Sequence, residues 1–168
     1  MRTILLDKRV HNRQNFDCGE KALNNYLKSI ASQQGAKDNA RTYVLIDTSK
    51  TNERSTIVGF YTLTMSTLKL HGLPPKLQKK HQSAQTAGLI ARMAVDKKYQ
   101  GKGLGEWLLV DALKRLLSAS NEVGFPLVIV DAKHSAMACY EQFGFSAFLD
   151  QDNKLFMTMA DIRLSSNK

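Results

Sequence analysis

Leu89-Ile-Ala-Arg-Met-Ala-Val-Asp96, followed by Lys97-Lys-Tyr-Gln-Gly-Lys-Gly-Leu-Gly105, is the stretch that decides the fold. Residues 89–95 form a short, mostly apolar run that predicts a buried strand. A glycine-rich turn comes next, and a helix is predicted after it because apolar residues recur at helical spacing. These apolar positions are Leu108, Leu109, Ala112, Leu113, Leu116 and Leu117. A strand, a glycine turn and a helix in this order direct backbone N–H groups and a helix dipole at one point, which suits an anion such as a pyrophosphate.

The glycine turn does not match two well-known phosphate-binding motifs. A P-loop ends in Gly-Lys-Ser or Gly-Lys-Thr, but here Gly103 follows the glycine–lysine pair. The dinucleotide motif Gly-x-Gly-x-x-Gly needs a third glycine, where this chain has Glu106 or Leu108. The pattern that fits is Gln-x-x-Gly-x-Gly, from Gln100 to Gly105. An ordinary glycine-rich turn before a helix is the structural alternative.

Composition and charge indicate one globular domain, predicted over residues 1–168. The 168 residues are 43% apolar and 23% charged, which is typical of soluble proteins with a substantial core. Lys and Arg number 24 against 15 Asp and Glu, giving a net charge of +9. That charge favours anionic partners such as nucleic acid or phosphorylated cofactors, with solubility alone as the alternative.

Two cysteines, Cys18 and Cys139, are too few for a disulfide framework and indicate a reducing compartment. No signal peptide and no membrane-spanning run is evident, so we expect a cytoplasmic protein with no membrane partner.

The other segments predict a mixed α/β sheet. Strands are expected at 3–6, 41–46, 56–64, 89–95, 127–130, 146–149 and 155–159, and helices at 104–117, at 135–143 and between residue 20 and Gly35. The strands at 41–46 and 56–64 form an antiparallel hairpin across a turn at 48–55, with a possible bulge at Gly59. The strands at 89–95 and 127–130 form a parallel pair because a helix connects them. Gly144 is predicted to end the helix 135–143.

Two further segments carry specific expectations. Asp17 and Glu20 read as a capping box at the start of the first helix, whose buried face is predicted to be Leu23, Tyr26, Leu27 and Ile30. The polar segment 71–85 is predicted to form a short helix after Pro75. This segment contains Lys76, Lys79 and Lys80. A solvated loop and a loop that contacts RNA or gates a substrate are equal alternatives for it.

The glycine motif and the strand before it resemble the acetyl-coenzyme A signature of the GNAT superfamily of N-acetyltransferases. A second motif, Tyr140-Glu-Gln-Phe143-Gly-Phe145, resembles the closing helix of the same superfamily. This resemblance implies a single-domain GNAT-like α/β fold, with a mixed central sheet, a parallel pair splayed at the cofactor site, and flanking helices. It also implies an N-acetyltransferase that uses acetyl-CoA. A core aromatic is the alternative role for Tyr140.

Further segments resemble the GNAT toxins of bacterial type II toxin–antitoxin systems. They are Phe16-Asp-Cys-Gly19, Ala40-Arg-Thr-Tyr-Val44, Gly59-Phe-Tyr-Thr-Leu63, Ala91-Arg-Met-Ala-Val-Asp96 and Gly101-Lys-Gly-Leu-Gly105. The resemblance implies acetylation of the amino group of aminoacyl-tRNA, which blocks translation, and a ribbon-helix-helix antitoxin as partner. A homodimer stays open. One alternative is an acetyltransferase for a small-molecule or protein amine. Another is a basic nucleic-acid-binding module without catalysis, against which the intact motif residues argue.

The resemblance assigns roles to particular residues. Cofactor binding falls to Met93, Ala94, Val95, Gln100, Gly101, Lys102, Gly103, Leu104, Gly105, Tyr140 and Phe143. Tyr140 is also the catalytic acid that protonates the leaving thiolate, and its unperturbed pKa of about 10 suits an acid that stays protonated at neutral pH. No metal site is expected. His11, His71, His81 and Glu106 are candidate general bases by residue type only, and surface solvation is the expectation for each histidine.

Overall fold

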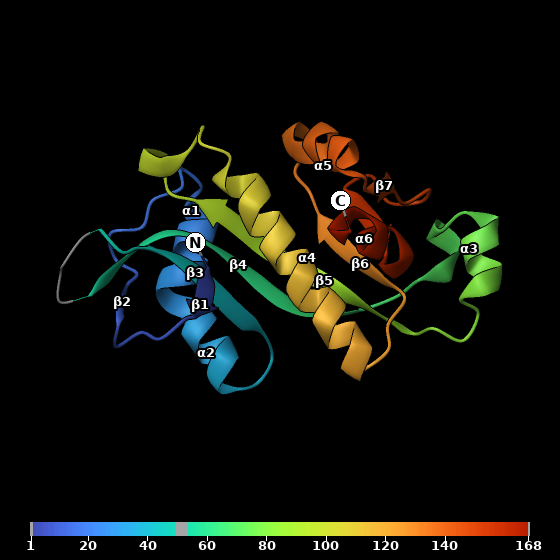
Figure 1. Cartoon of the computed structure of the whole chain (residues 1–168), viewed down its shortest axis with the longest axis horizontal. Coiled ribbons are helices and arrows are strands. Elements are labelled where there is room, and N and C mark those ends of the chain that lie inside the picture. The colour runs from blue at the N-terminus through green and yellow to red at the C-terminus, as the bar shows by residue number, and fades with distance from the viewer. Residues whose placement is uncertain (1, 50–53, 168) are drawn as a thin grey trace. The chain divides into compact units, whose positions relative to one another are not determined.

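The computed structural model describes residues 2–49 and 54–167 and has one mixed, eight-stranded sheet with helices (Figure 1). The strand order is β1-β3-β4-β5-β6-β8-β7, and β2 pairs with β4 outside this order. The strands are β1 (Thr3–Leu5), β2 (His11–Asn12), β3 (Arg41–Asp47), β4 (Ser55–Thr67), β5 (Thr86–Val95), β6 (Leu127–Asp131), β7 (Ser146–Ala147) and β8 (Lys154–Thr158). The α-helices are α1 (Lys21–Asn25), α2 (Ala31–Ala36), α3 (Pro75–Lys80), α4 (Leu104–Glu122), α5 (Met137–Phe143) and α6 (Met159–Ser166). Every strand and helix predicted from the sequence is present, and part of the predicted turn 48–55 lies outside the described residues.

The chain divides into two compact units. The first unit contains residues 1–64 and 91–112, and the second contains residues 65–90 and 113–168. The two longest strands, β4 and β5, and the helix α4 each contribute residues to both units.

In the first unit, β3 and β4 form the predicted antiparallel hairpin, and β1 pairs with β3. The register shifts between Leu45, opposite Gly59, and Ile46, opposite Ile57, so the bulge lies beside Gly59 as predicted. A Cβ atom on Gly59 would lie 2.8 Å from a methyl carbon of Leu108 on α4. A side chain at this position would therefore displace the end of the Leu108 side chain, and it would also lie 3.0 Å from the carbonyl oxygen of Ala94.

The first helix contains a π-helical turn, η1 (Tyr26–Ile30), between α1 and α2. Tyr26 and Leu27 are buried as predicted and pack with Phe16 and Phe60. The prediction for Ile30 is wrong, because its side chain is 43% exposed. A π turn has more residues per turn than an α-helix, so it displaces Ile30 from the apolar face that α-helical spacing predicts.

The predicted capping box is also wrong. Glu20 is the residue at the N-cap of α1, and its side chain makes no capping hydrogen bond. The carboxylate of Asp17 instead accepts hydrogen bonds from the Gly19 amide, at 2.9 Å, and the Asn24 side chain, at 2.8 Å. The Asp17 carboxylate therefore stabilises the loop before the helix.

In the second unit, the first residues of β5 pair with β6 in parallel, from Gly88 opposite Val128 to Ile90 opposite Val130. The strands β6, β8 and β7 continue this part of the sheet in antiparallel pairs. Gly144 ends α5 in the left-handed conformation, with φ of 119°, as predicted. The helix α6 was not predicted. Its signal is Thr158, whose hydroxyl accepts a hydrogen bond from the amide of Asp161 and so caps the helix.

The segment between β4 and β5 forms the 3-10 turn η2 (Leu70–Gly72) and the helix α3, the short helix predicted after Pro75. Leu73 is fully buried in a core cluster. Nε2 of His71 lies 2.6 Å from a carboxylate oxygen of Asp150, in the loop after β7. The three lysines of α3 are exposed.

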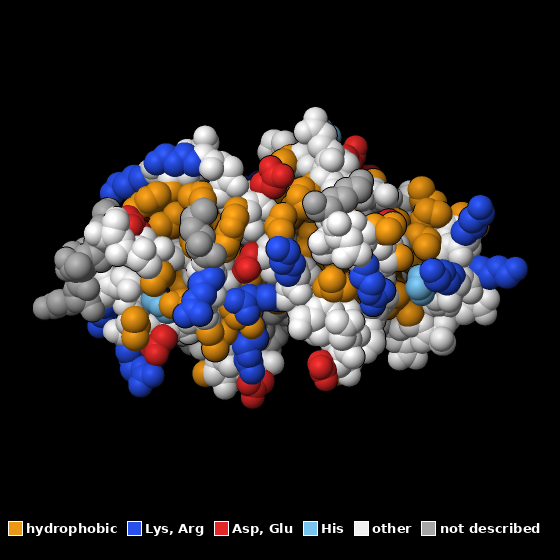
Figure 2. Space-filling view, in the orientation of Figure 1, with side chains coloured by type: hydrophobic (Ala, Val, Ile, Leu, Met, Phe, Trp, Pro, Cys, Tyr) orange, Lys and Arg blue, Asp and Glu red, His pale blue; other side chains and the backbone are white. Residues whose placement is uncertain are grey.

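Basic side chains outnumber acidic ones over the face drawn in Figure 2, in keeping with the net charge of +9. No helix within residues 2–49 and 54–167 has the length and apolar character that a membrane crossing requires.

Candidate cofactor site

The loop between β5 and α4 has the geometry of an anion cradle. Gly101 and Gly103 adopt left-handed backbone conformations, with φ of 76° and 75°, which residues other than glycine rarely adopt. No atom lies within 4 Å of the position that a Cβ would occupy at Gly101, Gly103 or Gly105. The loop backbone therefore borders open space where α4 begins at Leu104, and the first amides of a helix lack intrahelical acceptors. These residues fit a pyrophosphate group.

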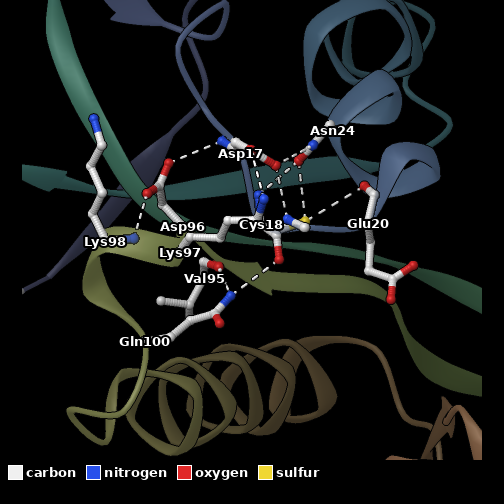
Figure 3. Close-up of polar contacts among 10 residues, drawn as sticks. Asp17, Cys18, Glu20, Asn24, Val95, Asp96, Lys97, Lys98 and Gln100 are labelled. Atoms are coloured by element: carbon white, nitrogen blue, oxygen red, sulfur yellow. Dashed lines mark hydrogen bonds and ion pairs between the residues drawn. The ribbon is translucent and has the colours of Figure 1, made fainter.

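The start of this loop is fixed by Asp96, which sequence reasoning did not single out (Figure 3). Asp96 is only 6% exposed. Its two carboxylate oxygens accept hydrogen bonds from the backbone amides of Asp17, at 3.0 Å, and Lys98, at 2.9 Å. The available signal was an aspartate directly after a strand, where it can cap the short 3-10 helix η3 (Lys97–Tyr99). The other hydrogen-bond partner of Asp96, the amide of Asp17, is 79 residues away in sequence. No local sequence pattern predicts this contact.

Positive charge lies along the loop. Lys97, Lys98 and Lys102 are exposed, and the ammonium group of Lys102 lies 5.7 Å from the ring centre of Tyr99. Lys97 forms an ion pair of 3.1 Å with Asp17. Hydrogen bonds from the Gly19 amide, the Asn24 side chain and Lys97 lower the pKa of Asp17 to about 2. Asp17 is therefore ionised at neutral pH and offsets the charge of Lys97.

The last residues of β5, Met93, Ala94 and Val95, precede this loop in the same unit. Ala94 is buried in the core cluster that contains Phe16, Tyr26 and Phe60. Met93 and Val95 are half-buried. Arg92 lies with its guanidinium carbon 4.8 Å from the ring centre of Tyr26. The structure thus brings nine of the predicted residues, those of the strand end and the loop, together with the Asp17–Gly19 segment in the first unit.

The two remaining predicted residues, Tyr140 and Phe143, lie on α5 in the second unit. Both are half-buried, and each packs against the buried ring of Phe145, at 5.6 Å and 6.4 Å between ring centres. Burial raises the pKa of the Tyr140 hydroxyl, and the neighbouring Cys139 adds to the increase. The Tyr140 hydroxyl therefore keeps its proton at neutral pH, as a general acid must.

The candidate general bases differ in their surroundings. The expectation of a solvated surface is wrong for His11, which is 2% exposed. Its Nδ1 accepts a hydrogen bond of 2.9 Å from the amide of Asp7, and burial lowers its pKa. His71 is paired with Asp150, and Glu106 is exposed in the first turn of α4. Within the described residues, no three His, Cys, Asp or Glu side chains are grouped so that they could hold a metal ion.

A strand, a glycine-rich turn and a helix N-terminus, arranged in this order in a mixed sheet, are typical of enzymes that bind a pyrophosphate-containing cofactor through backbone amides. The chain belongs to the acetyltransferase (GNAT) domain family, which it matches over residues 38–147. It is therefore an N-acetyltransferase that uses acetyl-CoA.

Similarity to individual proteins extends over nearly the whole chain. A tRNA-acetylating toxin of Mycobacterium tuberculosis is 31% identical, over 88% of this chain and 86% of its own length. The structure of AtaT complexed with acetyl-methionyl-tRNAfMet superimposes with a TM-score of 0.86 at 30% identity, covering 98% of each chain. A tyrosine-to-phenylalanine mutant of AtaT, bound to acetyl-CoA and to the C-terminus of the antitoxin AtaR, gives a TM-score of 0.81 at 26% identity. That match covers 99% of this chain and 98% of the other.

Proposed function

We propose that this enzyme transfers the acetyl group of acetyl-CoA to the α-amino group of aminoacyl-tRNA, and that it acts as a toxin that blocks translation. The observation that carries the proposal is the end-to-end similarity to AtaT, whose structure contains an acetylated aminoacyl-tRNA, with a TM-score of 0.86. The exposed lysines of α3 and the net charge of +9 support a polyanionic substrate.

The cofactor site gives each predicted residue a role. The backbone amides of the loop from Gln100 to Gly105 bind the pyrophosphate, with Lys102 beside it. The backbone of Met93, Ala94 and Val95 binds the pantetheine arm, and one N–H there stabilises the oxyanion as the amine attacks. The bound thioester supplies the acetyl group. Phe143 contributes an apolar surface to the site.

Tyr140 donates the proton of its hydroxyl to the leaving sulfur, and the proton that the attacking amine loses goes to solvent, from which the Tyr140 hydroxyl is restored. The raised pKa of this hydroxyl supports the role, because the acid remains protonated until the thiolate forms. An aminoacyl α-amine titrates at about 7.7–8.0 and is partly neutral near pH 8. A strong general base is therefore less necessary for this substrate than for a lysine amine.

The proposed function implies further partners and a place of action. The relative bound to AtaR supports an antitoxin partner for this chain, which we propose to be a small ribbon-helix-helix protein. A homodimer is also compatible with the proposal. Since charged tRNA is used in translation, the proposed site of action is the cytoplasm.

The direct test is transfer of radiolabelled acetyl groups to a pool of charged tRNA. We expect label on the charged pool and none on the same pool after deacylation, because deacylation removes the α-amine. Label on proteins or polyamines, with none on charged tRNA, would overturn the proposal and identify an acetyltransferase for those amines.

A further inference from the structure

The segment Phe16–Gly19 is held by specific contacts at every residue, although it forms no helix or strand. The ring of Phe16 is 1% exposed and packs in the core. The amide of Cys18 donates a hydrogen bond of 2.9 Å to the side chain of Asn24. The carbonyl of Asp17 accepts a bond of 2.9 Å from the amide of Lys97. A loop with this many bonds is rigid. Its contacts to residues 96–100 join it to residues 96–105, which connect β5 to the first turn of α4 and are called the cofactor loop.

Asp96 makes one half of this connection (Figure 3). Its carboxylate accepts one bond from the amide of Asp17 and one from the amide of Lys98. The amide of Asp96 itself donates to the carbonyl of Val58 on β4, at 2.8 Å. One buried residue therefore links three segments of the first unit: its side chain joins the loop 16–19 to the beginning of the cofactor loop, and its backbone amide joins both to the strand β4.

Gln100 makes the other half. Its side-chain nitrogen donates to the carbonyl of Val95 at 2.8 Å and to the carbonyl of Cys18 at 3.1 Å. A glutamine amide has two N–H donors, and both are used in these bonds. The remaining side-chain atom is an oxygen, which can only accept, so it cannot bond to an anionic phosphate. The first residue of the Gln-x-x-Gly-x-Gly motif thus directs its donors toward the protein.

We propose that Asp96 and Gln100 are positioning residues, which lock the cofactor loop, the end of β5 and the segment Phe16–Gly19 into one rigid body. The side chain of Gln100 fixes the carbonyl of Val95, beside the backbone that binds the acyl-carrying arm, and this side chain does not bind the phosphates. Because small displacements of a reacting group cost large factors in rate, this rigidity determines how the arm lies. The inference rests on the proposed placement of acetyl-CoA on this loop.

The first test uses the protein without cofactor and therefore does not depend on that placement. In Asp96→Asn, one carboxylate oxygen becomes an NH₂ group, so either the Asp17 or the Lys98 amide loses its acceptor. We expect at least tenfold faster hydrogen exchange at one of these amides, and Gln100→Ala should accelerate exchange in the segment 17–19. Matched controls are Asp111→Asn, which changes a carboxylate that accepts from Thr3 and Tyr61, and Gln33→Ala, which removes an exposed glutamine from α2. Unchanged exchange at residues 17–19 and 98 in both test variants would overturn the proposal.

The second test separates positioning from phosphate binding by changing the donor. Acetyl-pantetheine carries the thioester arm but lacks the pyrophosphate. We expect Gln100→Ala to lower kcat/KM on charged tRNA by about tenfold with acetyl-CoA, the loss typical of one or two neutral hydrogen bonds. The factor should be the same with acetyl-pantetheine. A loss seen with acetyl-CoA and absent with acetyl-pantetheine would identify Gln100 as a phosphate ligand and overturn the proposal.

The variant Gly103→Asp reports separately on the placement of the cofactor. It puts a negative charge in the proposed pyrophosphate cradle, so its loss of kcat/KM should be large with acetyl-CoA and small with acetyl-pantetheine. Equal losses with the two donors would overturn the placement. The hydrogen-exchange result would still decide whether Asp96 and Gln100 hold the loop.

Discussion

Tyr140 is the proposed general acid of the acetyl transfer. It is half-buried on α5, and burial raises the pKa of its hydroxyl. We predict that Tyr140→Phe retains acetyl-CoA binding, because the ring and its contact with Phe145 remain. Turnover should fall by roughly 10²–10⁴-fold, the usual contribution of general acid catalysis. Calorimetry and acetyl transfer to charged tRNA measure the two effects. A rate close to that of the unmodified enzyme would leave Tyr140 as a core aromatic.

His11 makes the stability of the protein depend on pH. Its Nδ1 accepts from the Asp7 amide, so the proton lies on Nε2, and Nε2 has no hydrogen-bond partner among the described residues. Burial lowers the pKa of His11 from 6.5, although the charge of Asp7 opposes the shift. The unfolded chain therefore takes up a proton at higher pH than the folded chain. Above about pH 6.5, His11 should be neutral in both states and should not lower the free energy of unfolding. As the pH decreases from there toward the lower pKa of the folded state, the free energy of unfolding should fall.

The pH prediction is checked by chemical denaturation between pH 5 and pH 8. His11→Gln keeps an acceptor for the Asp7 amide but cannot be protonated, so the loss of stability below pH 6.5 should become smaller. His81→Gln is the necessary control, because burial also lowers the pKa of His81. Asp7, with a pKa of about 2, affects stability only below about pH 4. An unchanged pH profile in His11→Gln would contradict the assignment.

At the scale of elements, two glycines of the cofactor loop should respond to alanine in opposite directions. Gly103 has a φ of 75°, so alanine there costs about 1 kcal/mol of backbone strain. Gly105 is the second residue of α4 and has no positive φ, so alanine there should add stability, by at most the roughly 0.5–1 kcal/mol that applies to a helix interior. Neither site has an atom within 4 Å of the new Cβ. For a chain of this length, Tm should change by about 2–4 °C per kcal/mol, downward at Gly103 and upward at Gly105. Thermal unfolding without cofactor measures both.

Elements with a strong local pattern could be predicted from the sequence. The strand β5, the glycine turn and α4 are encoded within 37 consecutive residues, from Thr86 to Glu122, by apolar spacing and glycine placement. The bulge beside Gly59 and the left-handed end of α5 at Gly144 were predictable for the same reason: both are required by local backbone geometry. The cofactor loop could be located in this way, and so could the lysines that surround it.

Features that depend on distant partners could not be predicted. The Asp17 side chain reads locally as a helix cap, but its backbone amide bonds to Asp96, 79 residues later. Ile30 follows the apolar pattern of an α-helix, yet the π turn places it at the surface. His11 reads as a polar surface residue, but the pairing of β2 with β4 buries it. In each case tertiary contacts override a correct local preference.

At the scale of the whole molecule, charge should govern how the enzyme binds its substrate. The net charge is +9, and each phosphate contact that releases a counterion lowers log K by roughly 0.7–0.9 per log unit of salt. We predict that changing Lys76, Lys79 and Lys80 of α3 to Glu weakens binding of charged tRNA and reduces its dependence on salt. Titrations of tRNA at several salt concentrations measure both quantities.

The same triple variant should still acetylate a small free amine, because α3 contributes no residue to the proposed acetyl-CoA site. This comparison controls for misfolding, since a misfolded protein would lose both activities. If the salt dependence of tRNA binding were unchanged, α3 would be a solvated segment that does not contact RNA.

The π turn at Tyr26–Ile30 also determines where the chain can lose one residue and keep its fold. A single π turn inside an α-helix holds one surplus residue, and the α-helical segments on either side keep their own hydrogen bonds. Deleting Ser29 should therefore let the helix close into regular α turns, with α1 and α2 each keeping the faces they now bury. A one-residue deletion in the middle of α4 would differ, because a regular α-helix contains no surplus residue. Such a deletion would rotate all later side chains of α4 by about 100°. The first helix is thus a place where homologous chains can differ by one residue without loss of the fold.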